Sequence, residues 1–127
     1  MFLYHAGFMT AGFLVLLAGG AVARYAKRRR WWLRAHRGLG WGGVALVLAG
    51  FAAIYMGKEE GPFQVPHGWL GAVVVLLAVV TPILGHLSFI MREKSATLRM
   101  VHRWSGRTTL ALMGLNILFG LFITGIL

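Results

Sequence analysis

The sequence predicts an all-α membrane protein in which four transmembrane helices form an up-down bundle, within a single domain over residues 1–127. The chain is 58% hydrophobic and only 13% charged, whereas soluble domains carry about 25% charged residues. The few charges leave four long stretches uncharged, and 13 lysines and arginines outnumber 3 acidic residues. Because the chain has no cysteine, disulfide scaffolds, zinc ribbons, iron–sulfur clusters and thiol chemistry are excluded.

The uncharged stretches predict the helices in order. They cover positions 1–23, 38–57, 61–91 and 108–127, and about 20 apolar residues are enough for a helix to cross the hydrocarbon core. None of the stretches has the polar stripe of a helix in a soluble bundle. We therefore expect helices at about residues 2–25, 35–57, 66–91 and 100–126. No basic segment precedes the first stretch, so we interpret it as a retained span rather than a signal peptide.

The distribution of cations predicts the orientation. Twelve of the 13 cations flank the first and third connections, whereas the second connection holds Lys58 beside Glu59 and Glu60. By the positive-inside rule, the first and third connections are cytoplasmic and both termini lie outside. We expect a multi-pass integral membrane protein in contact with lipid. The basicity is attributed to topology and not to nucleic acid, which would need a soluble basic face.

Four of the five histidines occupy equivalent places. His5, His36, His67 and His102 each lie near the start of one predicted helix, at intervals of 31, 31 and 35 residues. Successive helices alternate in direction, and diagonal helices face each other across an up-down bundle. His5 should therefore meet His67 at the outer end, and His36 should meet His102 at the inner end. The helical rise separates these two levels by roughly 20–25 Å.

Glycines accompany the histidines. His36, His67 and His102 are each followed by x-x-x-Gly, which places a glycine one turn on, on the same helix face. A flat macrocycle bonded to the histidine would need this helix face to be free of side chains, and glycine meets that need. Further glycines near the opposite helix ends are expected to clear the edges of that ligand: Gly19, Gly20 and Gly85 inward, and Gly50 and Gly120 outward.

Two facing histidines favour haem over other metal centres. Zinc usually takes four ligands, often including cysteine or carboxylate, whereas haem iron takes two axial ligands and histidine is a common one. No C-x-x-C-H motif is present, which excludes covalent attachment. A single histidine at a membrane boundary is ordinarily an interfacial residue, but four at matched depths favour ligation. We predict two haems b per chain, with outer iron ligands His5 and His67 and inner iron ligands His36 and His102.

The fifth histidine, His86, lies deeper in the third predicted helix. We expect it to form a hydrogen bond near the inner haem or to reach the interface. Replacement of His36 or His102 as an iron ligand by His86 stays open.

These residues together resemble the cytochrome b561 family, including the b561 modules attached to DOMON domains. The likeness covers nearly the whole chain. It rests on His5-Ala-Gly-Phe-Met9, Gly19-Gly-Ala-Val-Ala-Arg-Tyr25, Trp32-Leu-Arg-Ala-His36, His67-Gly-Trp-Leu-Gly71, His102-Arg-Trp-Ser-Gly-Arg107 and Asn116-Ile-Leu-Phe-Gly120. The resemblance implies a four-helix core that carries two haems b through the same diagonal pairs. Members usually have one or two further helices, so the lateral surfaces here are expected to contact lipid, a second copy or another subunit.

The expected function is transmembrane electron transfer. We expect a cytoplasmic-side donor, ascorbate-like or quinol, and an outer-side acceptor, which is ferric iron, monodehydroascorbate or a redox partner protein. The resemblance implies ascorbate as the donor and ferric iron or monodehydroascorbate as the acceptor. Ferric reductase activity is one form of this reaction, and no catalytic side chain is expected. Arginines near the inner level are expected to neutralise haem propionates and attract an anionic donor, or to act only as topology signals: Arg24, Arg34, Arg37, Arg103 and Arg107.

Few polar residues lie near the outer level. Tyr55, Lys58 and Gln64 are the candidates for contact with a propionate or an acceptor. Asn116 lies well inside the fourth helix, where an amide is costly unless it is bonded. We expect it to contact the outer haem or to tie helices together.

Two alternative functions stay open. One is a haem-bearing membrane anchor subunit of a quinone-linked oxidoreductase complex. The other is a haem-free small four-helix transporter, which the positions of Glu59, Glu60 and Glu93 in loops disfavour, because proton-driven transport normally uses an intramembrane carboxylate. A homodimer or a subunit of a larger redox complex is expected.

Overall fold

Four long helices make up most of the protein in the computed structural model, which describes residues 1–57 and 62–126. They are α1 (Phe2–Tyr25), α2 (Trp32–Met56), α3 (Pro66–Ile90) and α4 (Ser95–Ile123), with short 3-10 turns at Pro62–Gln64 and Arg92–Lys94. All four helices are long and apolar enough to cross a membrane. The predicted fold class is therefore confirmed.

Two helices begin earlier than expected. α2 begins at Trp32 rather than near residue 35, and α4 begins at Ser95 rather than near residue 100. The additional turns carry the exposed Arg34 and Arg99. A long basic side chain keeps its charged group in water while its stem covers apolar surface, so a helix can continue past such residues into the interface. α3 begins at Pro66, where proline suits the first turn.

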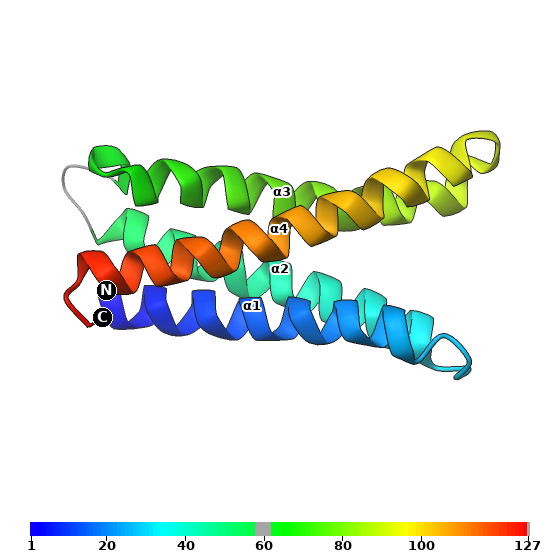
Figure 1. Ribbon diagram of the computed structural model, residues 1–127, viewed down its shortest axis with the longest axis horizontal. Coiled ribbons are helices and arrows are strands. Elements are labelled where there is room, and N and C mark those ends of the chain that lie inside the picture. Colours follow the sequence, from blue (N-terminus) through cyan, green and yellow to red (C-terminus); the bar gives the residue numbers. More distant parts are fainter. Residues whose placement is uncertain (58–61, 127) are drawn as a thin grey trace.

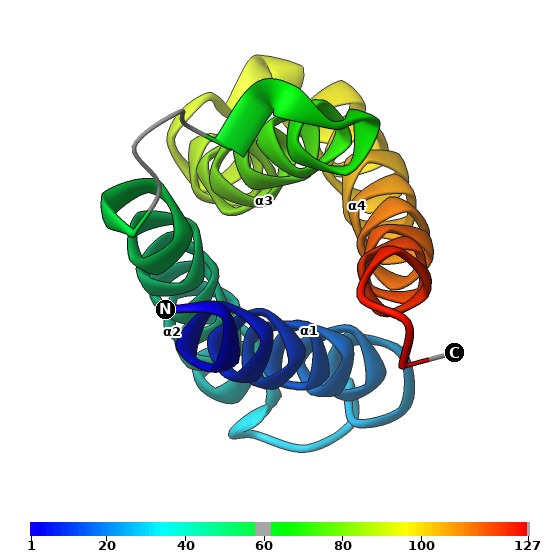
Figure 2. The same cartoon turned by 90° about the vertical axis from the view of Figure 1, so that its left-hand side faces the viewer.

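The helices form two antiparallel hairpins, α1–α2 and α3–α4 (Figure 1). Each hairpin is closely packed, whereas the contacts of α2 with α3 and of α1 with α4 are fewer. Viewed along the bundle, the four helices surround a central axis (Figure 2). Both chain ends lie at one end of the bundle, here called the terminal end. The opposite end carries the α1–α2 and α3–α4 connections with the twelve clustered cations, and is called the basic end.

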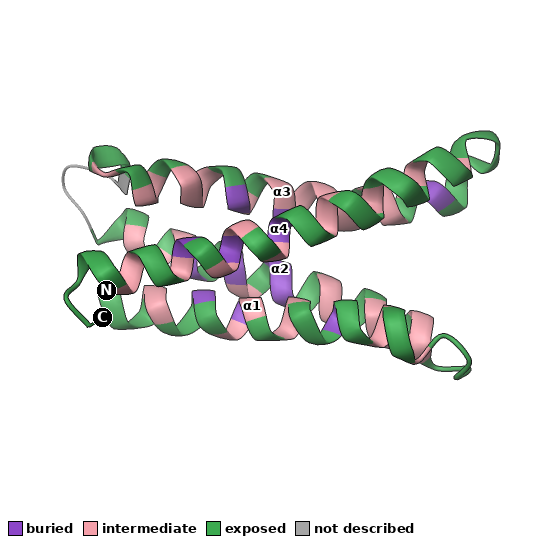
Figure 3. Ribbon diagram, in the orientation of Figure 1, coloured by how far each residue is buried: buried purple, intermediate pink, exposed green. Residues whose placement is uncertain are grey.

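The hydrophobic core lies in the middle of the bundle. All four helices contribute to a cluster of buried side chains: Met9, Val47, Val74, Ala78 and Met113. Figure 3 shows these buried segments near the centre, with exposed surface dominating toward both ends. Many large apolar side chains point outward, as expected for helices that contact lipid. The two ends of the bundle therefore depend on contacts other than this core.

Glycine allows α1 and α2 to approach closely. A Cβ atom added at Gly12 would lie 2.8 Å from the side chain of Val47, and one added at Gly43 would lie 2.6 Å from the side chain of Leu16. Small residues at such crossings allow helix backbones to come together in membranes, where packing rather than the hydrophobic effect drives association.

Candidate functional site

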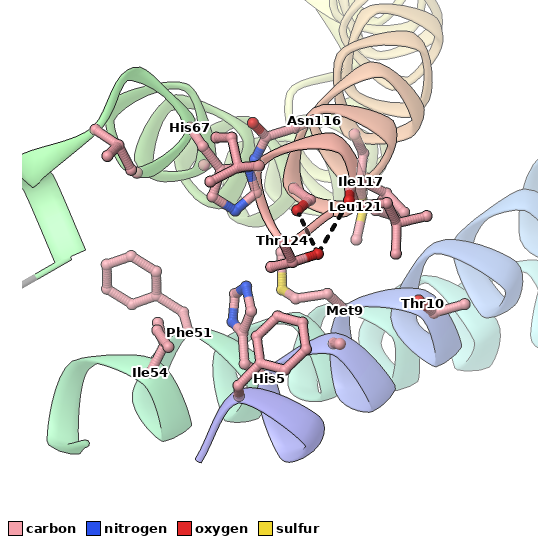
Figure 4. A pocket seen from close by; sticks show the side chains of 18 residues that line it. His5, Met9, Thr10, Phe51, Ile54, His67, Asn116, Ile117, Leu121 and Thr124 are labelled. Atoms are coloured by element: carbon pink, nitrogen blue, oxygen red, sulfur yellow. Dashed lines mark hydrogen bonds between the residues drawn. The ribbon is translucent and has the colours of Figure 1, made fainter. Parts of the chain in front are cut away.

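Two histidines face each other at the terminal end. His5 of α1 and His67 of α3 have ring centroids 6.2 Å apart and ring planes at 85°. Figure 4 shows both imidazoles extending into one pocket from opposite helices. The structure thus brings together the two residues that the sequence pairs at this end.

A second pair lies toward the basic end. His36 of α2 and His102 of α4 have ring centroids 5.8 Å apart, again with planes at 85°. His36 contacts the backbone of Gly19, which is fourteen positions after His5 on α1. The rise along α1 therefore separates the two histidine levels by about 21 Å.

Hydrogen bonds fix the orientation of three of these rings. The Nδ1 of His5 lies 2.9 Å from the carbonyl oxygen of Gly50, and the Nδ1 of His36 lies 2.9 Å from that of Gly19. The Nδ1 of His102 lies 2.7 Å from the carbonyl oxygen of Thr81. A carbonyl oxygen only accepts, so Nδ1 carries the proton and Nε2 keeps its lone pair. This is the arrangement of metal-binding histidines, in which the second ring nitrogen donates to an outer partner.

The glycines near the opposite helix ends contact the imidazole rings directly. A Cβ atom at Gly85 would lie 3.0 Å from His102 Cε1, and one at Gly120 would lie 2.9 Å from His67 Cε1. Gly19 and Gly50 supply carbonyl acceptors. Gly85 and Gly120 therefore leave room for histidine rings, and Gly19 and Gly50 bind such rings through their carbonyl oxygens. That these glycines also clear the edges of a planar ligand stays a prediction.

The glycines of the three His-x-x-x-Gly segments differ among themselves. A Cβ atom at Gly40 would meet no described atom within 4 Å, whereas Cβ atoms at Gly71 and Gly106 would lie near Asn116 and Thr81. Gly40 therefore has open surroundings among the described residues, Gly106 has only an ordinary contact, and Gly71 lies close to the Asn116 side chain.

The terminal-end pair lies in a largely apolar cavity of about 220 Å³. His5, His67, Met9, Phe51 and Asn116 are among the side chains that line it (Figure 4). Asn116 is only 3% exposed, and its Oδ1 has no hydrogen-bond partner among the described residues. A buried carbonyl oxygen without a partner costs about 1–3 kcal/mol. Asn116 therefore presents an unmet acceptor at the cavity that holds the histidines.

The predicted inner arginines differ in their contacts. The guanidinium of Arg24 lies over the ring of Tyr25 and that of Arg107 over the ring of Trp104, at 5.7 and 5.1 Å. Both rings are exposed. Arg34 and Arg103 are exposed too. These four residues thus lie exposed around the basic end.

Arg37 and His86 bridge the two hairpins. Arg37 Nη2 lies 3.1 Å from His86 Nδ1, which joins α2 to α3 at the basic end. Since a guanidinium only donates, this nitrogen of His86 is the acceptor. The expectation of a hydrogen bond for His86 is met, with Arg37 as the partner. The facing rings of His36 and His102 leave His86 outside the pair.

The polar candidates at the terminal end are exposed. Tyr55 is 58% exposed and stacks on Phe51, and Gln64 is exposed in the turn before α3. Lys58 lies outside the described residues, as do Glu59 and Glu60.

A cluster of hydroxyl groups near His102 was not anticipated from the sequence. The Thr81 hydroxyl on α3 lies within hydrogen-bonding distance of the hydroxyls of Ser105 and Thr109 on α4. The sequence contains only a weak indication of this cluster. Ser105 and Thr109 share one face of α4, at a spacing of one turn.

The spacing of each histidine pair fits two imidazoles that would hold one haem iron between them. In the described part of the chain, no three His, Cys, Asp or Glu side chains converge on one point, so each pair offers two nitrogens. An imidazole nitrogen lies about 2 Å from a bound metal and roughly 1 Å from its ring centre, which puts two axial imidazoles roughly 6 Å apart. The observed centroid distances are 6.2 and 5.8 Å.

Four membrane-length helices with a histidine pair at each end define a class of membrane protein that holds haem between its helices. The family model described as eukaryotic cytochrome b561 matches residues 4–126, nearly the whole chain. The protein belongs to the cytochrome b561 family. It has no significant match among proteins of curated function or among solved structures. Family membership establishes haem b binding and transmembrane electron transfer in general terms.

Proposed function

We propose that the protein transfers electrons across a membrane between two haems b, one held by His5 and His67 and the other by His36 and His102. The observation that carries this proposal is the presence of two facing histidine pairs at opposite ends of one bundle, with ring centroids 6.2 and 5.8 Å apart. Each haem b supplies a one-electron ferric–ferrous couple when bound.

The chain's own contribution is to orient and tune the ligands. Hydrogen bonds from Nδ1 to backbone carbonyls hold the rings of His5, His36 and His102. Such bonds raise the basicity of the ligating nitrogen and fix its tautomer. At the terminal end, Asn116 lines the cavity, and its buried Oδ1 has no partner among the described residues, which supports a contact between Asn116 and the haem at that end.

The charge distribution supports a direction. The basic end carries twelve cations and the single acidic residue Glu93, so the positive-inside rule favours a cytoplasmic location for this end and an outside location for both termini. A strongly positive surface raises the local concentration of an anionic donor, such as an ascorbate-like molecule. Arg24, Arg37, Arg103 and Arg107 are the candidate contacts for haem propionates or for this donor. A quinol is the alternative donor.

The acceptor is expected at the terminal end. Tyr55 and Gln64 are exposed there, and the candidate acceptors are ferric iron, monodehydroascorbate or a redox partner protein. Ferric reductase activity follows where the acceptor is iron. The exposed apolar surface of the helices supports contact with lipid and with a second copy or another subunit of a redox complex.

The first test is a reduced-minus-oxidised absorption spectrum of the purified protein, with haem content measured as pyridine haemochrome. We expect two low-spin haems b per chain. Changing His5 or His67 to Ala should remove the terminal-end haem, and changing His36 or His102 to Ala should remove the basic-end haem. His86→Ala is the matched control, since His86 lies outside both pairs, and it should keep both haems.

Other outcomes would contradict the proposal in distinct ways. One haem in the wild type would show that one pair is not a ligand pair. Loss of haem in His86→Ala would assign a ligand role to that residue. Haem reduction that requires quinol and a stably bound peripheral subunit would favour the membrane-anchor alternative.

A further inference from the structure

A chain of hydroxyl groups joins α3 to α4 beside His102. The Thr81 hydroxyl lies 2.7 Å from the carbonyl oxygen of Leu77 and 2.6 Å from the Ser105 hydroxyl. A hydroxyl has one proton. Thr81 gives its proton to the carbonyl, so Ser105 donates to Thr81. The Thr109 hydroxyl donates to the Ser105 carbonyl at 2.8 Å and lies 3.4 Å from the Thr81 hydroxyl.

These groups lie in an apolar setting. Thr109 is 3% exposed, and Thr81 and Ser105 are partly buried. Hydroxyl groups that bond across helices stabilise their association in membranes. Satisfied polar groups in such surroundings also hold neighbouring helices in one arrangement. The bond between Thr81 and Ser105 therefore sets how α3 and α4 lie against each other at this depth.

The same residue, Thr81, holds the ring of His102. Its backbone carbonyl accepts the proton of His102 Nδ1 at 2.7 Å. Ser105 follows His102 by three positions on α4, so both lie on one face of that helix. Two contacts one turn apart thus connect Thr81 to α4, one through the carbonyl and one through the hydroxyl. A shift of one helix along the other would lengthen both.

The residues of α3 around Thr81 shape the space beside its carbonyl. Thr81 bonds back to the carbonyl four residues earlier, a contact that bends helices. Pro82 follows directly inside α3, and proline removes a backbone donor and crowds the preceding turn. Gly85, one turn further along, leaves space for the ring, because a Cβ atom there would lie 3.0 Å from His102.

For His5 and His36, the residue that supplies the carbonyl acceptor has no hydroxyl contact to a neighbouring helix. His5 and His36 donate to the carbonyls of Gly50 and Gly19, and glycine has no side chain to anchor the acceptor. At the terminal end, the exposed Thr124 bonds carbonyls of its own helix, those of Gly120 and Leu121. Within the described residues, the cross-helix hydroxyl contacts lie beside His102.

We propose that Thr81 is a positioning residue for His102, with Ser105 as its partner: their hydroxyl contact holds the Thr81 carbonyl on His102 Nδ1 and thereby lowers the reduction potential of the basic-end haem. This rests on the proposed function, in which His102 is an axial ligand. A well-aligned Nδ1–H···O=C bond makes the imidazole a stronger donor, which stabilises ferric iron. Loss of the hydroxyl contact should weaken this bond without removing any ligand.

The test compares Thr81→Val and Ser105→Ala with Thr81→Ser, which keeps a hydroxyl. Thr108→Val is the matched control, because Thr108 is an exposed threonine on α4 outside the cluster. The two disruptive variants should keep both haems. Potentiometry should show that the reduction potential of the basic-end haem rises. At a fixed applied potential its ferric-to-ferrous ratio should shift by up to about tenfold toward ferrous, which corresponds to ~59 mV for one electron. Its low-spin EPR signal should broaden, while Thr81→Ser and Thr108→Val stay close to wild type.

A second readout does not depend on haem. In haem-free protein, the His102 Nδ1 proton should exchange with solvent about tenfold faster in Thr81→Val and Ser105→Ala than in wild type, by NMR. Unchanged exchange in both disruptive variants would overturn the positioning role. Failure of the wild type to bind haem would instead contradict the proposed function, and the exchange measurement would still decide the role of Thr81.

Discussion

The His36 ring on α2 donates from Nδ1 to the Gly19 carbonyl on α1 across 2.9 Å. A reciprocal bond of the same length runs from His5 on α1 to Gly50 on α2. Each helix of this hairpin therefore contributes a histidine at one end and an acceptor at the other. Sliding one helix along the other would break both bonds, so the register of α1 and α2 and the orientation of one histidine from each pair are determined together.

Close packing of this hairpin predicts a stability difference between two adjacent glycines. Gly43→Ala should destabilise the protein by about 1–3 kcal/mol, because its Cβ would lie 2.6 Å from Leu16 Cγ and 3.2 Å from the Leu16 backbone nitrogen. Gly42→Ala is the control, with no described atom within 4 Å of its Cβ, and should be neutral or slightly stabilising. Unfolding in detergent measures both. Equal effects would show that α1 and α2 are not in close contact here.

Contact between Gly120 and His67 predicts a selective effect on the terminal-end haem. Gly120→Ala places a Cβ 2.9 Å from His67 Cε1 and should lower the affinity for that haem about tenfold, as changes beside ligands commonly do. Gly85→Ala should do the same to the basic-end haem, through His102. Gly114→Ala, whose Cβ has only an ordinary contact with Phe13 at 3.7 Å, is the control. Haem titration followed by EPR separates the two sites, and identical spectra for all three variants would contradict the site assignment.

Burial of Asn116 predicts opposite effects with and without haem. Asn116→Leu removes an acceptor that has no partner among the described residues, so the haem-free protein should become more stable by about 1 kcal/mol. The haem-bound variant should be no more stable than the haem-bound wild type. It should also release the terminal-end haem more readily, because a contact to the cofactor is lost. Thermal unfolding of both forms tests this. Equal stabilisation of both forms would mean that Asn116 does not contact the haem.

The exposed position of Arg37 at the basic end predicts a role in donor binding. Arg37→Gln should slow haem reduction by an anionic donor about tenfold at low ionic strength, with the difference shrinking as salt screens the surface. Arg28→Gln removes the same charge from the α1–α2 connection and serves as the control for net charge. Stopped-flow reduction at several salt concentrations measures both. If the two variants behave alike, only the overall charge matters.

The cation distribution predicts the membrane orientation, and the natural absence of cysteine makes it easy to test. A single cysteine at Glu93 should react with an impermeant maleimide only after cells are permeabilised. A single cysteine at Gln64 should react in intact cells, because it lies at the opposite end of the bundle. The reverse labelling pattern would place the basic end outside.

The sequence alone determined the four spans and the pairing of the histidines. Charges interrupt apolar stretches of membrane length, and alternation of direction then assigns each histidine to one end. His5 with His67 and His36 with His102 follow from these two facts, and the structure brings the same residues together. The predicted starts of the second and fourth helices, near residues 35 and 100, lie later than the observed starts at Trp32 and Ser95, because a helix can continue through basic residues at the membrane interface.

Only the tertiary structure decided what surrounds the histidines. The uncharged stretches have no polar stripe, so their composition does not indicate which face turns inward or how far one helix is displaced along another. The acceptor roles of Gly19 and Gly50, the contact of Arg37 with His86, and the position of Thr81 against Ser105 all depend on that rotation and register. Close packing at glycines, together with hydrogen bonds between helices, sets both.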